Sequence, residues 1–296
     1  MKIFDCFMYF DEDEILDLRI NILNEKVDYF VIVESTYNHK GENRKLLFNI
    51  NKFERFKKKI IYLVYDQIPH RVKEIKDNDS EKIKINKHIY NAVFRENAQR
   101  NYIINGIKDA DKDDIIIISD IDEIPNINSC NFSKIKNEII IFKQDMFHYK
   151  YNLCIPNFKW SGSKAVKKKK LISPQWLRNI KNRKYPIYRI DTFFSEKKYI
   201  NIKMIENGGW HFTNIKTANE ILHKYKSYLH HWEFDETNIG ENEIQNLIDT
   251  KQAIYNLKTD KRNNKFKDGV KLEKYNINKL PIYIQDNLKK YQKWID

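Results

Sequence analysis

A run of four isoleucines flanked by acids, DIIIISD at residues 114–120, constrains the fold more than any other feature of the chain. Short continuous runs of β-branched residues are typical of strands that are buried on both faces. Residues 28–34 (DYFVIVE) and 60–65 (IIYLVY) have the same character. Such strands occur in sheets that helices cover on both sides, so the sequence predicts an α/β fold.

Helical periodicity separates these strands along the chain. Apolar residues of segment 14–24 fall on one helical face, and segment 88–107 is amphipathic in the same way. With an extended segment at 3–10, the order of elements predicts a doubly wound, mostly parallel, Rossmann-like sheet. Ligands of such sheets bind outside the carboxyl ends of the strands, so the acids that end two strands, Glu34 and Asp120, are candidates for a site.

Beyond Pro125 the sequence becomes more polar and more aromatic. We expect extended segments at residues 138–143, 146–153 and 199–205. We also expect a basic irregular region at residues 157–183 and one further helix at about residues 217–230. The last sixty residues are rich in Lys and Asn and weakly helical. We therefore expect a main domain over residues 1–240, with accessory helices of a Lys-rich extension, residues 241–296, packed on it.

The charge and cysteine content bound the classes of function. The net charge of +13 indicates either attraction to anions or a general bias towards Lys, and the run Lys167–Lys170 is typical of a solvated loop. The basic residues are spread along the chain without a nucleic-acid-binding motif, so no nucleic-acid partner is expected, although a basic nucleic-acid-binding protein is one alternative. Three scattered cysteines argue against a disulfide framework or a zinc site.

The chain shows neither a secretory signal nor a run of 18 apolar residues. We expect a cytoplasmic protein that contacts a membrane, if at all, peripherally through its basic surface.

Asp120 and Asp122 are two residues apart, so both carboxylates point to one side of an extended chain. Two close carboxylates repel each other unless a cation lies between them, and hard oxygen ligands favour Mg²⁺ or Mn²⁺. Such an ion would neutralise the charge that develops on a diphosphate leaving group. The alternatives are a polar turn without metal, or the paired acids of a metal-dependent nucleotidyltransferase or phosphohydrolase.

Five segments in register resemble one enzyme family. They resemble the glycosyltransferases that include the β-1,4-mannosyl-glycoprotein 4-β-N-acetylglucosaminyltransferase, which adds bisecting GlcNAc, and its microbial relatives. The segments are DCFMYFDEDEILDLRINIL (5–23), VDYFVIVES (27–35), RENAQR (95–100), DDIIIISDIDEIP (113–125) and GGWHF (208–212). The resemblance implies a GT-A-like fold, inversion at the anomeric carbon, a UDP-sugar donor with UDP-GlcNAc first, a divalent cation (Mn²⁺ or Mg²⁺), and a glycan or lipid-linked saccharide acceptor.

The resemblance also assigns roles to residues. It implies a metal site made by Asp120, Asp122 and His211. It also implies a donor site made by Glu34, Ser35, Arg95, Gln99, Arg100 and Asp120. Trp210 would form the floor under an acceptor sugar, with Trp160 as a second acceptor-binding candidate. Gly208 and Gly209 would let the backbone approach a ligand. The structural alternatives are a salt-bridged helix for the arginines, a capping acid for Glu34 and a packed imidazole for His211.

An inverting transfer needs a base that accepts the proton of the acceptor hydroxyl. Glu220, in the first turn of the predicted helix after GGWHF, and Asp191 are the two catalytic candidates, ahead of Glu206 and Glu233. The stretch 227–233 follows the microbial S-x-x-H-x-E pattern with one extra residue, which leaves the roles of His230 and Glu233 open.

Overall fold

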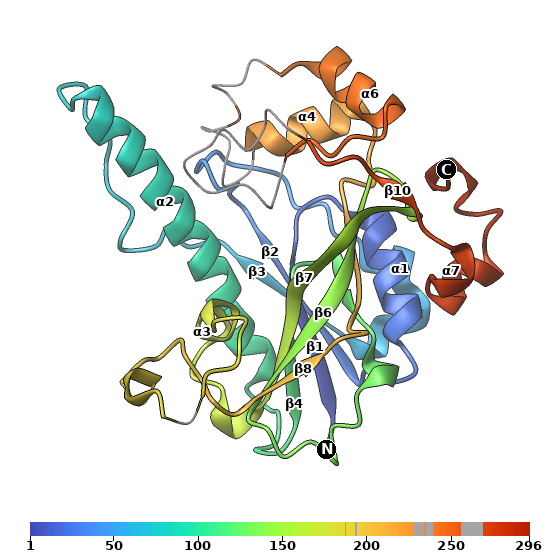
Figure 1. Ribbon diagram of the computed structural model, residues 1–296. Coiled ribbons are helices and arrows are strands. Elements are labelled where there is room, and N and C mark those ends of the chain that lie inside the picture. The colour runs from blue at the N-terminus through green and yellow to red at the C-terminus, as the bar shows by residue number, and fades with distance from the viewer. Residues whose placement is uncertain (187, 193, 228–233, 235–238, 256–268) are drawn as a thin grey trace.

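The computed structural model describes residues 1–186, 188–192, 194–227, 234, 239–255 and 269–296. Within these residues, a curled sheet runs through the molecule with helices on both faces (Figure 1). Its strand order is β3-β2-β1-β4-β7-β6-β9-β5, and β8 and β10 pair with β6 and β7. This mixed α/β arrangement confirms the predicted Rossmann-like, GT-A-like fold.

The first half of the sheet consists of four parallel strands, which are β1 (Ile3–Tyr9), β2 (Tyr29–Ser35), β3 (Ile60–Tyr65) and β4 (Ile115–Ile118). All four isoleucines of β4 are buried. Because side chains alternate along a strand, Ile115 and Ile117 join the core under α1 (Asp13–Leu23), whereas Ile116 and Ile118 join the core on the other face. The expected burial on both faces is confirmed.

On that second face lies α2 (Glu81–Asn101), which is longer than the predicted helix (Figure 1). The helix begins at Glu81 instead of residue 88. Residues Tyr102–Ile107 form a 3₁₀ helix, where Ile103 and Ile107 are fully buried.

The second half of the sheet contains β5 (Glu123–Pro125), β6 (Ile139–His148), β7 (Leu153–Lys167), β8 (Ile202–Ile205) and β9 (Gly209–Thr213). The prediction of an irregular region over 157–183 is wrong, because β7 extends to Lys167 and α3 spans Pro174–Asn179. Antiparallel pairing with β4 on one side and β6 on the other satisfies the polar backbone of β7 and buries residues 162–166. The strand is set by its pairing at both edges, with the distant β4 and with the preceding β6, which local composition does not reveal.

The C-terminal part contributes α4 (Ala218–Ser227), α6 (Glu241–Asp249), β10 (Glu273–Lys274) and α7 (Ile282–Asp286). Helix α6 lies beside α4, and α7 lies beside α1 (Figure 1). Leu280, Ile284, Tyr291 and Trp294 are buried in the same core as α1. In the described part of the chain, none of the helices has the length and apolar character needed to cross a membrane.

Candidate active site

The turn that follows β4 carries the acidic motif, and a buried arginine holds it. Arg19 of α1 is fully buried and forms an ion pair with Asp5 of β1 at 2.6 Å. Its remaining nitrogen, Nη1, donates hydrogen bonds to the carbonyl oxygens of Asp120, Ile121 and Glu123 at 3.2, 3.1 and 2.7 Å. Arg19 thereby fixes the backbone of the acidic turn, residues 120–123, through three of its carbonyl oxygens.

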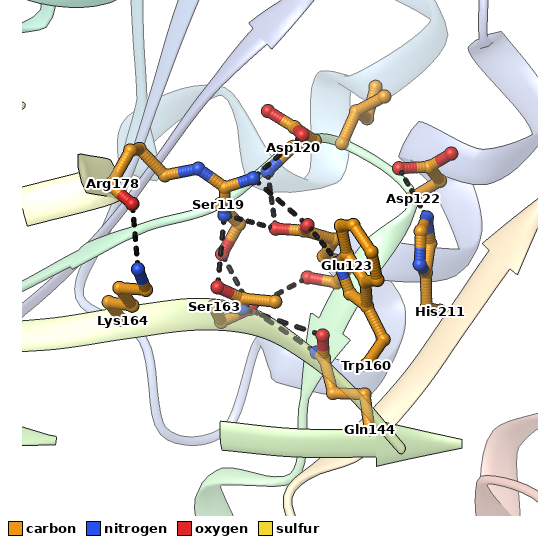
Figure 2. Close-up of polar contacts among 12 residues, drawn as sticks. Ser119, Asp120, Asp122, Glu123, Gln144, Trp160, Ser163, Lys164, Arg178 and His211 are labelled. Atoms are coloured by element: carbon orange, nitrogen blue, oxygen red, sulfur yellow. Dashed lines mark hydrogen bonds and ion pairs between the residues drawn. The ribbon is translucent and has the colours of Figure 1, made fainter. Parts of the chain in front are cut away.

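Asp120 lies between two arginines at the carboxyl end of β4. Its Oδ1 is 3.0 Å from Nη2 of Arg100. Its Oδ2 is 2.8 Å from Nη2 of Arg178 (Figure 2). Burial acts to raise the pKa of Asp120, but the two guanidinium groups outweigh it and hold the pKa below the usual range. Arg178 also forms an ion pair with the fully buried Glu123 at 2.6 Å, and these two carboxylates raise the pKa of Arg178 against the opposing effect of burial.

Asp122 and His211 form a second pair, on the side of the turn away from Arg178 (Figure 2). Nε2 of His211 is 3.4 Å from Oδ1 of Asp122, and Nζ of Lys224 is 3.9 Å from Oδ2. Desolvation opposes both charges, yet the mutual attraction lowers the pKa of Asp122 and raises that of His211. Nδ1 of His211 is buried without a hydrogen-bond partner.

Strand pairing brings His211 to this position. Residue Glu123 of β5 is opposite His211 of β9, and Gly209 is opposite Pro125. Gly209 has a φ of +121°, and a Cβ there would lie 2.2 Å from the carbonyl oxygen of Ile124. The close approach that this glycine permits in the structure is therefore between two strands.

Trp160 of β7 forms a wall beside the pair. Its indole nitrogen donates to Oε1 of Glu123 at 2.7 Å, and its ring centroid is 5.5 Å from that of His211. Trp210 precedes His211 on β9 and therefore points to the opposite face. Its indole nitrogen lies 3.4 Å from the carbonyl oxygen of Lys279, away from the cavity.

The RENAQR motif on α2, residues 95–100, contains residues that face the site and one, Arg95, that does not. Gln99 donates to the carbonyl oxygen of Val33 at 3.1 Å, and Arg100 binds Glu96 as well as Asp120. Both side chains line the cavity. Arg95 instead donates to the carbonyl oxygens of residues 39 and 40, at 3.1 and 2.9 Å, and so holds the loop after β2.

Glu34, at the end of β2, has its oxygens engaged within the protein. It is fully buried and accepts hydrogen bonds from the backbone N–H groups of Leu47 and Phe48 and from the hydroxyl of Tyr62. Arg44 lies 3.1 Å away. The next residue, Ser35, lines the cavity, so the strand end supplies one cavity residue and one that organises the loop.

The residues that face the site line a cavity of about 320 Å³. It extends from the ends of β1 and β2 to α4. Its polar lining includes Ser35, His39, Arg44, Gln99, Arg100, Asp120, Asp122, Trp160, His211, Asn214, Lys224 and Tyr255.

The sequence profile of glycosyltransferase family 17 matches residues 1–295, which is nearly the whole chain. The chain belongs to glycosyltransferase family 17. A comparison with curated proteins gives no match. The family identifies the protein as a glycosyltransferase, and the resemblance to the bisecting GlcNAc transferases is confirmed at the level of the family. In general terms, such an enzyme takes a nucleotide-sugar donor and a glycan acceptor.

The other predicted residues of this family 17 enzyme lie farther from the motif. Glu220 is exposed at the start of α4, where its Oε2 accepts hydrogen bonds from the backbone N–H and the hydroxyl of Thr217 at 2.8 and 2.7 Å. Asp191 forms ion pairs with Arg189 and Lys198 on a segment that does not line the cavity. Glu206 is exposed at the end of β8, and His230 and Glu233 lie outside the described residues.

Several polar groups of the site were not predicted. Arg178 was hidden in the segment expected to be irregular, and Lys164, whose Nζ donates to the carbonyl oxygens of Arg178 and Ile180 at 2.7 Å each, anchors that segment. Burial lowers the pKa of Lys164 to about 7. Lys224 reaches the cavity from α4, and Asn214 reaches it from the end of β9. No local pattern distinguishes them, since Lys and Asn are abundant throughout the chain.

The residues fit a divalent cation in part. Among the described residues, no group of three or more His, Cys, Asp and Glu side chains is arranged to hold a metal ion. Asp122 and His211 offer one carboxylate oxygen and one imidazole nitrogen within 3.4 Å of each other, while both oxygens of Asp120 contact arginines. Two protein ligands suit an ion whose other positions are taken by water and phosphate oxygens.

Proposed function

We propose that this family 17 glycosyltransferase transfers a sugar with inversion, from a UDP-sugar with UDP-GlcNAc as first candidate, to a glycan or a lipid-linked saccharide, and that it requires Mn²⁺ or Mg²⁺. The observation that carries the proposal is the Asp122–His211 pair, which lies beside the arginine-bound Asp120 in one cavity at the carboxyl ends of the parallel strands. Open α/β sheets bind their ligands at this edge.

The donor diphosphate is expected to lie between the acidic turn and α2. Arg100 offers a guanidinium group there, which recognises phosphate oxygens through charged hydrogen bonds, while Arg178 of α3 holds Asp120 from outside the cavity lining. When bound by Asp122 and His211, the cation would neutralise charge on the departing diphosphate. Asp120 would orient the two arginines, while Ser35 and Gln99 would contact the nucleoside side of the donor.

The reaction itself is a displacement at the anomeric carbon. The acceptor oxygen forms a bond to this carbon, the bond to the diphosphate oxygen breaks, and the nucleoside diphosphate leaves with the electron pair. A carboxylate accepts the proton of the acceptor hydroxyl. We propose Glu220 for this role, because it lines a second cavity that shares Asp122 with the first, and Asp191 is the alternative.

Replacement of the base tests this assignment. Glu220→Gln is expected to lower kcat by about 10²- to 10⁴-fold, with the affinity for UDP unchanged. Glu243→Gln, on the exposed face of α6, is the matched control. If Glu220→Gln retains full kcat and Asp191→Asn loses it, Asp191 is the base.

Product analysis tests the reaction class. The purified enzyme with Mn²⁺ and UDP-GlcNAc is expected to release intact UDP, whereas a nucleotidyltransferase or phosphohydrolase would cleave within the phosphate chain. Asp122→Asn should abolish UDP release, and Asp113→Asn, at an exposed ion pair with Lys167, should not. If neither UDP-GlcNAc nor any other UDP-sugar is bound or hydrolysed, the proposal fails.

Contact with a membrane surface is a further part of the proposal. Ile172, Tyr188, Ile190 and Phe194 are strongly exposed on the segment after β7, with Lys181, Arg183, Lys184 and Arg189 among them. Exposed apolar side chains among basic ones suit the interface of an anionic bilayer. Co-sedimentation with phosphatidylglycerol vesicles, and its loss in Phe194→Ser, would support this contact.

A further inference from the structure

A second cavity, of about 210 Å³, adjoins the first, and the two share Glu12, Asp122, Asn214 and Lys224. Among the charged side chains that line the second cavity, acids outnumber bases. Six carboxylates, those of Asp11, Glu12, Asp13, Glu14, Asp122 and Glu220, are accompanied by the two lysines Lys216 and Lys224. This excess of negative charge disfavours an anionic ligand.

Asn214 lies at the junction of the two cavities in an unusual conformation. Its φ is +55°, in the left-handed region that residues other than glycine rarely adopt. The residue is 3% exposed, and its Nδ2 donates to the hydroxyl of Tyr225 at 3.0 Å. Its Oδ1 is buried without a hydrogen-bond partner. Strained backbone and unsatisfied polar atoms concentrate at sites that bind ligands.

The chemistry of the unpartnered atom defines the ligand. As a hydrogen-bonding group an amide oxygen is an acceptor only, and its other chemistry is cation coordination, so a hydrogen-bonding partner must carry an O–H or N–H group. An ionised diphosphate has no such group, whereas saccharide hydroxyls do. The side chain of Tyr225 that holds the amide is itself hydrogen-bonded to Tyr255, and Tyr255 to Thr213, so the amide is fixed in place by a buried network.

We infer that the second cavity is the acceptor subsite, that it takes a neutral saccharide, and that Oδ1 of Asn214 accepts a hydrogen bond from a hydroxyl of that saccharide. The inference rests on the proposed function, because it divides the reaction between the two cavities. The donor diphosphate occupies the first cavity beside Arg100, the acceptor occupies the second, and the two meet at Asp122 and Asn214.

Asn214→Gly is the sharpest test, because glycine adopts a positive φ without strain, so the backbone keeps its conformation while the side chain and its hydrogen bond to Tyr225 are removed. Asn157→Gly is the matched control, since Asn157 is an exposed asparagine with a φ of +53° outside both cavities. Thermal unfolding of both variants verifies that they are folded.

Binding of neutral p-nitrophenyl hexosides, those of glucose, galactose, mannose and GlcNAc, is measured by saturation-transfer NMR without donor. We expect the wild type to bind at least one of them and to bind p-nitrophenyl glucuronide more weakly. Asn214→Gly should weaken the hexoside affinity by about tenfold or more, which corresponds to about 1.4 kcal/mol. Asn157→Gly should match the wild type, and the affinity of both variants for UDP with Mn²⁺ should be unchanged.

The inference is overturned if the wild type binds none of the hexosides, if Asn214→Gly binds them as well as the wild type, or if UDP affinity falls as much as hexoside affinity. Failure of the proposed function gives a different result. In that case the wild type binds no UDP-sugar with Mn²⁺, while hexoside binding still depends on Asn214.

Discussion

The two halves of the sheet place residues at the active site by different means. In the half formed by β1 to β4, parallel apolar strands are buried on both faces, and the acidic turn follows directly from the end of β4. In the half formed by β5 to β9, β7 pairs with β4 and β9 with β5, so Trp160 and His211 reach the site through that pairing, whereas Arg178 comes from α3. The first half supplies a buried base and the acidic turn, and the second adds Trp160 and His211 to the cavity.

The largest expected effect is on the buried link between these halves. Arg19→Met leaves Asp5 buried without its partner and frees three carbonyl oxygens of the acidic turn, so the free energy of unfolding should fall by about 3–5 kcal/mol. Urea denaturation measures the change. The control is Lys52→Met, at an exposed ion pair with Asp13, with an expected loss below about 1 kcal/mol. An equal loss in both variants would mean that Arg19 does not join the halves.

A smaller effect is expected for an arginine of the second half. Arg178→Met leaves Glu123, which is fully buried, without a cation and leaves Asp120 with Arg100 alone, and should lower the free energy of unfolding by about 1–3 kcal/mol. It should also weaken UDP binding, as calorimetry would show, whereas the exposed Arg183→Met should change neither quantity. Stability loss with unaltered UDP affinity would assign Arg178 to the fold alone.

The Asp122–His211 pair, which joins the acidic turn to β9 of the second half, predicts a pH dependence of the stability. The folded-state pKa of His211 is raised. The contribution of protonated His211 to the free energy of unfolding is therefore complete below pH 6.5, the ordinary pKa of histidine, and is lost as the pH rises through the folded-state pKa. The folded-state pKa of Asp122 is lowered. The contribution of ionised Asp122 to the free energy of unfolding is therefore complete above pH 3.8, the ordinary pKa of aspartate, and is lost as the pH falls through the folded-state pKa. Denaturation of wild type and His211→Gln should therefore differ most between pH 3.8 and 6.5, and the difference should shrink in alkaline solution. A difference that is constant with pH would contradict the charged pair.

The smallest effect is expected on the surface. Lys169 pairs with Asp113 while both side chains are well exposed, so Lys169→Ala should change the free energy of unfolding by no more than about 0.5 kcal/mol. Melting temperatures in low and high salt would measure it. A large, salt-dependent loss would show that the Lys167–Lys170 run has a role beyond a solvated surface.

The sequence predicted the first half well because its signals are local. Four isoleucines in a row, with acids after them, identify a strand and its functional end without knowledge of its neighbours. Residues of the second half lack such signals. The polar segment that was expected to be irregular becomes β7 because β4 and β6 pair with its backbone, and Arg178 and Asn214 have neighbours that no spacing along the chain reveals.

The same contrast applies within the predicted site. Asp120, Asp122, Arg100 and His211 come together in one cavity, whereas Arg95 and Glu34 bind the loop that follows β2, and Trp210 points away. Family motifs mark positions that matter to the fold and to ligands alike, so a motif cannot separate a residue that contacts a ligand from one that supports a loop.

Calorimetric titration of UDP into the enzyme tests the central claim that the acidic end of β4 is a cation-dependent donor site. UDP should bind at least about tenfold more tightly with Mn²⁺ than with EDTA. The difference should disappear in Asp122→Asn and persist in Asp113→Asn. Equal affinity with Mn²⁺ and EDTA, or an Asp122→Asn variant that keeps the full effect of Mn²⁺, would contradict the claim.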